Sequence, residues 1–256
     1  MDEDLKNSRR INAVFFDLGN TLVTGDEFLE EDALKLNQKL FKSIGYDFSI
    51  EELRMANKRA TDYTQKKYRG NPKIHGRGVF LSAMCKFLHL NIDKELIERM
   101  DREFRKKYHA SFKLVKHAKE ILSYLKNNGF ILVLISNGST EGVNEIIDNV
   151  GLRPYFDLII ISEEIGKQKC TTVPIKVALE RLGLRPEEVV MVGDRLDEDI
   201  IGAKRLGMVA IKHDYGKWKD VNYSGEDVKP DFVIRDLLEL RKILETLENR
   251  KELNTP

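Results

Sequence analysis

The sequence predicts an α/β protein in which a doubly wound parallel sheet carries an inserted all-helical domain. Short, almost continuously apolar runs recur along the chain, as strands buried on both faces of a sheet require. In the second half these runs alternate with amphipathic helical patterns, which is typical of a parallel sheet. Between residues 25 and 111 only helical patterns occur. We therefore expect an α/β core domain made of residues 1–24 and 112–256, and a helical domain made of residues 25–111.

The core elements are predicted from these apolar runs and from the glycines between them. The predicted strands are residues 12–16, 130–135, 158–161, 189–192, 208–211 and 232–234. Helices with one apolar face are expected to end at Gly129, Gly183 and Gly207, since glycine readily adopts the left-handed backbone that closes a helix.

The inserted helical domain shows four helical patterns, at residues 28–44, 49–68, 79–88 and 96–108. Ser49 and Glu52 have the spacing of a capping box and mark the start of the second helix. Residues 70–78 are rich in glycine and are expected to form a loop. In this loop, Lys73, His75 and Arg77 are either solvated or in contact with a substrate's leaving group or a remote anion.

The composition argues against several classes of protein. Lys and Arg number 43 and Asp and Glu 42, so no strong field favours nucleic acid or an anionic membrane. We interpret the basic stretch that begins at Arg105 as a solvated helix face. Cys85 and Cys170 lie far apart without metal-ligand spacing, which indicates a reducing compartment. Residues 1–10 are polar, unlike a signal peptide, and the longest apolar run is too short to span a membrane. We expect a cytoplasmic monomer or homodimer that binds neither nucleic acid nor membrane.

The first candidate functional residue is Asp17, which closes the first strand in the sequence VFFDLGNTL. Ligands of doubly wound sheets bind beyond the carboxyl ends of the strands, so a carboxylate at this point suits a nucleophile. An Asp followed by Gly and Asn also forms ordinary turns, and that alternative stays open for this motif alone.

A second motif ends the strand at residues 130–135 with Ser136, Asn137 and Gly138. A hydroxyl and free turn amides at the carboxyl edge of a sheet suit phosphate oxygens. The same three residues also make a good loop, with a serine as the cap of the next helix.

A third motif places several carboxylates directly after a strand, in the sequence VMVGDRLDEDIIGA. Asp194 and Asp199 are candidates for holding a hard cation such as Mg²⁺, because crowded carboxylates repel one another unless a cation is present. We interpret Asp197 and Glu198 as solvated or capping residues. An acidic helix start that favours the helix dipole is the alternative.

In this order the motifs resemble those of the haloacid dehalogenase superfamily of phosphotransferases, over residues 12–247. The resemblance implies that Asp17 is the nucleophile and that Lys169, chosen over Lys167 by its spacing to Ala178, neutralises phosphoryl charge. It also implies that phosphate or substrate is bound by Thr21, Ser136, Asn137 and Lys169. The implied Mg²⁺ ligands are Asp17, the backbone carbonyl of Gly19 and Asp194, with Asp199 acting through water or by orienting Lys169. The helical insertion matches the cap domain of the superfamily.

One residue departs from the pattern of the superfamily: Gly19 stands where a second aspartate usually provides the general acid and base. The resemblance therefore implies a slow, Mg²⁺-dependent phosphohydrolase that acts on a small phosphorylated metabolite through an aspartyl phosphate at Asp17. A regulatory protein that binds a phosphorylated ligand without turnover is the alternative. A 2-haloacid dehalogenase or a phosphonate hydrolase is a minor alternative, because relatives of both kinds also lack this aspartate.

Overall fold

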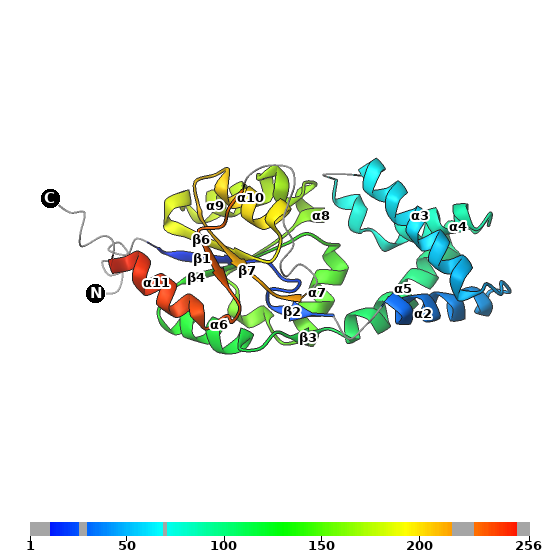
Figure 1. Cartoon of the computed structure of the whole chain (residues 1–256), viewed down its shortest axis with the longest axis horizontal. Helices are drawn as coiled ribbons and strands as arrows, with labels where there is room; N and C mark the ends of the chain where they lie inside the picture. The colour runs from blue at the N-terminus through cyan, green and yellow to red at the C-terminus, as the bar shows by residue number, and fades with distance from the viewer. Residues whose placement is uncertain (1–10, 26–29, 69–70, 217–227, 250–256) are drawn as a thin grey trace.

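The computed structural model describes residues 11–25, 30–68, 71–216 and 228–249, and within them the predicted parallel sheet is present (Figure 1). Its order is β5-β4-β1-β6-β7-β8, and every neighbouring pair is parallel. The strands are β1 (Ala13–Phe16), β4 (Ile131–Ser136), β5 (Leu158–Ile161), β6 (Val189–Gly193), β7 (Val209–His213) and β8 (Phe232–Ile234). All six predicted strands are confirmed. The chain runs from β1 outward in both directions, so the carboxyl ends of β1, β4 and β6 meet at one point.

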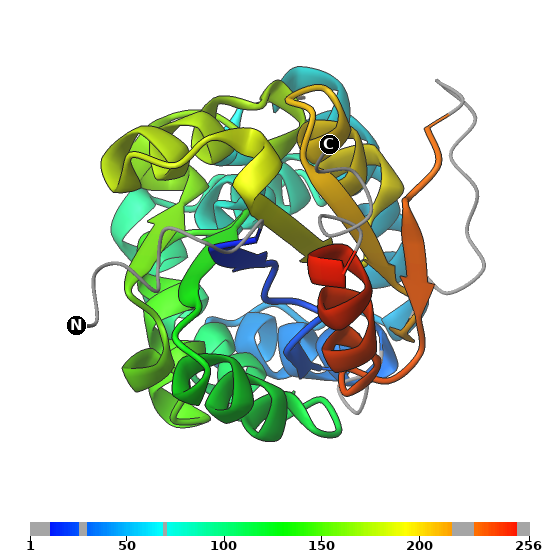
Figure 2. The same ribbon diagram turned by 90° about the vertical axis from the view of Figure 1, so that its left-hand side faces the viewer.

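Two helical layers cover the sheet on opposite sides (Figure 2). One layer contains α6 (Ala118–Asn127), α7 (Thr140–Asn149) and α11 (Glu239–Asn249); the other contains α9 (Val173–Leu182) and α10 (Ile201–Lys204). In β1, Val14 and Phe16 pack against the first layer, whereas Phe15 packs against the second. All three side chains are fully buried, which explains why the strand is apolar throughout.

The helical insertion forms a separate body with its own hydrophobic core, at the right of Figure 1. Its helices are α2 (Glu30–Ser43), α3 (Ile50–Tyr68), α4 (Arg77–Phe87) and α5 (Lys94–Ala110), close to the four predicted ones. The capping box is present, because the Ser49 amide donates to the Glu52 carboxylate at 2.8 Å and the Glu52 amide donates to the Ser49 hydroxyl at 3.2 Å. The predicted loop at residues 70–78 contains a 3₁₀ turn, Pro72–His75, and already includes the start of α4.

The insertion is joined to the core by contacts that the sequence did not reveal. Where the chain leaves and re-enters the core, β2 (Val23–Thr24) pairs antiparallel with β3 (Lys113–Leu114). Next to this pair, α5 lies against α7, an ion pair joins Arg105 to Glu141, and a hydrogen bond joins His109 Nδ1 to the Glu145 carboxylate. The interpretation of Arg105 as part of a solvated face is therefore wrong: its side chain is only 14% exposed and also contacts Asp101. The lysines that follow Arg105 are exposed.

Within the described ranges, no helix is both long enough and apolar enough to cross a membrane. Cys85 is buried and Cys170 is half-buried, and neither takes part in a disulfide.

The packing of α6 can be tested by truncating one of its buried side chains. Leu122 is fully buried between α6 and the sheet, so Leu122→Ala should lower the free energy of unfolding by about 2–5 kcal/mol, from lost burial and the cavity left behind. The matched control is Val233→Ala on β8, where the side chain is 53% exposed and the change should stay within about 0.5 kcal/mol. Urea unfolding followed by circular dichroism measures both; equal losses would contradict this packing.

Candidate active site

A cavity of about 850 Å³ opens at the carboxyl edge of the sheet, between the strand ends and the insertion. The predicted residues that line it are Asp17, Gly19, Ser136, Asn137, Lys169, Asp194 and Asp199. Tyr108, His109 and Phe112 form its wall on the side of α5, and Val143 and Ile146 of α7 add apolar surface. The fold thus gathers residues from distant parts of the sequence, between Asp17 and Asp199, around one cavity.

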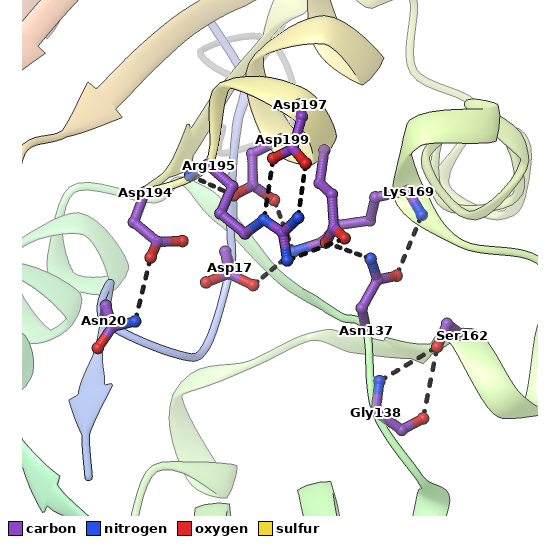
Figure 3. Close-up of polar contacts among 11 residues, drawn as sticks. Asp17, Asn20, Asn137, Gly138, Ser162, Lys169, Asp194, Arg195, Asp197 and Asp199 are labelled. Carbon is purple, nitrogen blue, oxygen red and sulfur yellow. Dashed lines mark hydrogen bonds and ion pairs between the residues drawn. The ribbon is translucent and has the colours of Figure 1, made fainter. Parts of the chain in front are cut away.

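The centre of the site is the ammonium group of Lys169, which lies between two carboxylates (Figure 3). It forms an ion pair with Asp17 Oδ1 and another with Asp199 Oδ1 at 2.6 Å. The second oxygen of Asp17 accepts a hydrogen bond from the Thr21 hydroxyl at 3.1 Å. Asp17 is therefore held at both oxygens, at the end of β1 and facing the cavity.

Burial and charge act against each other on these groups. Burial opposes the charge on Lys169, but Asp17, Asp199 and Glu198 together outweigh it and raise the pKa of Lys169 above its ordinary value. Burial, with a contribution from Asp17, raises the pKa of Asp199 to about 6 although Lys169 acts to lower it. Lys169 thus carries a permanent positive charge beside the candidate nucleophile.

Among the described residues, Asp194 is the carboxylate of the site that forms no ion pair with a cationic side chain. It is 2% exposed, and its Oδ2 accepts a hydrogen bond from the Asn20 side-chain amide at 3.2 Å. Burial, then repulsion from Asp17 and Asp199, raises the pKa of Asp194 to about 8. Oxygen atoms of these three carboxylates lie within 4.8 Å of one another. Three buried oxygen donors with only one ammonium group among them suit a hard divalent cation, which would offset this repulsion.

Two features of the backbone, a π-helical turn and a glycine, allow the Asp199 side chain to reach Lys169. Residues Leu196–Ile200 form a π-helical turn, a wider turn that often occurs at functional sites. Asp199 also lies directly over Gly193: a Cβ atom at residue 193 would be 2.3 Å from Asp199 Cγ. Glycine at residue 193 therefore leaves the space that the Asp199 side chain occupies.

The predicted phosphate-binding residues differ in how they face the cavity. Ser136 is 5% exposed and lines the cavity at the end of β4. Asn137 braces the loop instead, because its side chain accepts from the Lys169 amide at 3.1 Å and donates to Glu198. Thr21 is fully buried and holds Asp17. That Ser136, Asn137 and Thr21 contact a phosphate group stays a prediction.

Two residues of the site were not identified from the sequence. Glu198 lines the cavity, contacts Asn137, and has a pKa raised by burial, so its interpretation as a solvated or capping residue is wrong. Arg195 also lines the cavity and joins Asp197 through two hydrogen bonds, at 2.9 and 2.6 Å, and Glu198 through an ion pair at 3.1 Å. Both residues follow Asp194 closely in the sequence, which could have indicated that they belong to the site. The π-helical turn, however, decides which of these side chains face the cavity. The side chains of His75 and Arg77 lie outside the described part of the structure.

Gly19 lies at the cavity with free space around it. Apart from its two chain neighbours, no atom of the described residues comes within 4 Å of the position where a Cβ would be, and its backbone is not left-handed. The left-handed residue of this turn is Asn20, with φ of 53°. An aspartate would therefore fit at residue 19 without backbone strain.

The family model, the relatives and the solved structure that match this chain agree with one another. The model of the haloacid dehalogenase-like hydrolase family matches residues 11–207. The chain is 31% identical to the glyceraldehyde 3-phosphate phosphatase of Methanocaldococcus jannaschii, covering 93% of this chain and 99% of the relative. It is 30% identical to the protein of the same name from Methanopyrus kandleri, covering 90% and 97%. A solved structure of a HAD phosphatase from Thermococcus onnurineus matches with a TM-score of 0.66 at 26% identity, covering 91% of this chain and 98% of that one.

The close approach at Gly193 can be tested with two glycine substitutions in the same site. Gly193→Ala would force Asp199 away from Lys169 and should lower the free energy of unfolding by about 1–3 kcal/mol, as overpacking does. Gly19→Ala places its methyl group in free space and should change it by no more than about 0.5 kcal/mol. Urea unfolding measures both, and an unaltered Gly193→Ala protein would argue against the placement of Asp199.

Proposed function

Because this chain belongs to the haloacid dehalogenase-like hydrolase family, we propose that it hydrolyses the phosphate ester of a small phosphorylated metabolite, with Mg²⁺ as cofactor. The observation that carries the proposal is the buried Asp17 carboxylate, held by Lys169 and Thr21 at the edge of the cavity. Relatives that match nearly the whole chain are named glyceraldehyde 3-phosphate phosphatases, so triose and sugar phosphates are the first substrates to test.

The proposed reaction has two steps. An Asp17 oxygen attacks phosphorus, the bond between phosphorus and the leaving oxygen breaks, and the leaving oxygen takes a proton from water. Water then attacks the aspartyl phosphate, which releases inorganic phosphate and restores Asp17. Lys169 neutralises charge on the phosphoryl oxygens while Asp199 holds it in place. Bound by Asp17, Asp194 and the Gly19 carbonyl, Mg²⁺ would supply further electrostatic stabilisation of that charge.

We infer that this enzyme is slow, since residue 19 offers no carboxylate to protonate the leaving group or to activate water. General acid–base catalysis is typically worth about 10² to 10⁴ in rate. Without it, the second step is slowed at least as much as the first, and phosphorylated Asp17 accumulates. A protein that binds the phosphorylated ligand without turnover would have the same binding residues and is the competing hypothesis.

The metal requirement is tested with EDTA and with Asp194→Asn. EDTA should abolish phosphate release and Mg²⁺ restore it. Above pH 8, where Asp194 is ionised, Asp194→Asn removes a buried charge that faces two other carboxylates, so there the metal-free variant should unfold at a higher temperature than the metal-free wild type. It should also lose most of the stabilisation by Mg²⁺, which for a single site is about 2.7 kcal/mol at 100 times Kd. Asp62→Asn, at an exposed position of α3, is the control and should keep the full Mg²⁺ effect. Full phosphate release in EDTA would contradict the metal requirement.

The role of residue 19 is tested by restoring the missing carboxylate. Gly19→Asp should raise turnover by about 10² to 10⁴, because the new side chain enters free space beside Asp17. Gly19→Asn, of the same size but without the acid, should bring no such gain. Phosphate release from a panel of phosphate esters measures the effect.

Trapping with a labelled phosphate ester examines the wild type directly. Label should remain on wild-type Asp17 after acid quenching and be absent from Asp17→Asn. If neither the wild type nor Gly19→Asp carries label or releases phosphate with Mg²⁺ across the panel, the protein binds its ligand without turnover.

A further inference from the structure

Asn20 adopts a backbone conformation that its side chain makes unfavourable. Its φ of 53° lies in the left-handed region, where glycine fits without strain and asparagine is tolerated at some cost. Its backbone amide donates to the Val23 carbonyl at 2.6 Å, which closes the turn. A glycine would adopt the same turn with less strain. We therefore attribute the presence of asparagine at this position to the contacts that its side chain makes.

The Asn20 side chain contacts the carboxylate of Asp194. Its Nδ2 donates to Asp194 Oδ2 at 3.2 Å (Figure 3). Its Oδ1 faces Gly216, where an added Cβ would come within 2.8 Å of that oxygen. Asn20 is thus confined on one side by backbone and on the other by the carboxylate, and it leaves Oδ1 of Asp194 without this hydrogen bond.

A second contact holds the backbone of Asn20. His213, at the carboxyl end of β7, is 1% exposed, and its Nδ1 lies 3.1 Å from the Asn20 carbonyl oxygen. A carbonyl oxygen only accepts, so Nδ1 carries the proton. Burial lowers the pKa of His213, in keeping with a neutral ring. Its Nε2 has no hydrogen-bond partner among the described residues, and the ring stacks on Tyr215 with 5.3 Å between centroids.

We propose that Asn20 and His213 are positioning residues for the metal-binding carboxylate Asp194. His213 holds the Asn20 carbonyl, this fixes the left-handed turn, and the turn directs the Asn20 amide to one oxygen of Asp194. The other oxygen is then oriented for the divalent cation. The inference rests on the metal site of the proposed function, and residues that orient metal ligands typically change metal affinity by about 10- to 100-fold.

Within the described ranges the buried Nε2 of His213 has no hydrogen-bond partner, and this supports a specific role for His213. Leaving a buried polar nitrogen without a partner is unfavourable, and an apolar ring of the same size would avoid it. Phenylalanine would keep the stacking on Tyr215 but could not donate to Asn20. The hydrogen bond from Nδ1 is the contribution that only a donor at this position can make.

The test measures Mg²⁺ binding directly, by calorimetry and by the shift in unfolding temperature during a MgCl₂ titration of the full chain. Asn20→Gly keeps the turn and removes the amide, so the Mg²⁺ concentration at half-saturation should rise about 10- to 100-fold. His213→Phe should also raise the Mg²⁺ concentration at half-saturation. His213→Asn places an amide near the position of Nδ1, so its Mg²⁺ affinity should stay closer to the wild type even though it packs less well.

The outcomes separate a positioning role from a merely structural one. If His213→Asn loses Mg²⁺ affinity while His213→Phe keeps it, packing alone matters and the inference is wrong. Wild-type Mg²⁺ affinity in Asn20→Gly would also overturn it, even if phosphate release confirms the proposed function. Conversely, if the wild type binds Mg²⁺ and the variants bind it more weakly without any turnover on phosphate esters, the inference holds and the proposed reaction fails. In an active enzyme, the KM for the ester at saturating Mg²⁺ should change far less than the Mg²⁺ requirement.

Discussion

The site depends on one buried ammonium group between two carboxylates. Burying charged groups is unfavourable unless they are paired with good geometry, and Lys169 meets this condition only while Asp17 and Asp199 both reach it. These three residues come from the end of β1, the 3₁₀ turn Lys169–Thr171 and the π-helical turn Leu196–Ile200. The positions of three separate loops are therefore linked through a single cation.

In the same arrangement, Asp194 has a different electrostatic environment from Asp17 and Asp199. Lys169 pairs with Asp17 and Asp199, but the third carboxylate, Asp194, faces them and, among the described residues, accepts only an amide hydrogen bond from Asn20. Burial, and then repulsion from Asp17 and Asp199, raises the pKa of Asp194. A site that is unfavourable when metal-free and favourable with a cation is a reasonable basis for metal-dependent chemistry, since the cation removes the repulsion that the fold retains.

Access to this centre is set by the helical insertion. Tyr108, His109 and Phe112 place the end of α5 at the cavity, and the polar contacts of Arg105 and His109 with α7 connect that wall to the helix after Ser136. The candidate catalytic residues therefore lie at the carboxyl edge of the sheet, whereas α5 and α7 largely determine the shape of the cavity beyond Asp17. We expect relatives that act on different substrates to differ first in the cavity-lining residues of α5 and α7.

The sequence alone determined the six sheet strands, the helical insertion and the strand-end residues Asp17, Ser136 and Asp194, because buried parallel strands are continuously apolar and place their next residues at one edge. It did not reveal the two-residue strands β2 and β3, which are too short for a periodic pattern. Nor did it indicate that Glu198 faces inward or that His213 holds Asn20, 193 residues away in the chain. Those contacts exist only once the sheet order brings β7 and the turn after β1 to the same edge, so the tertiary structure alone decided them.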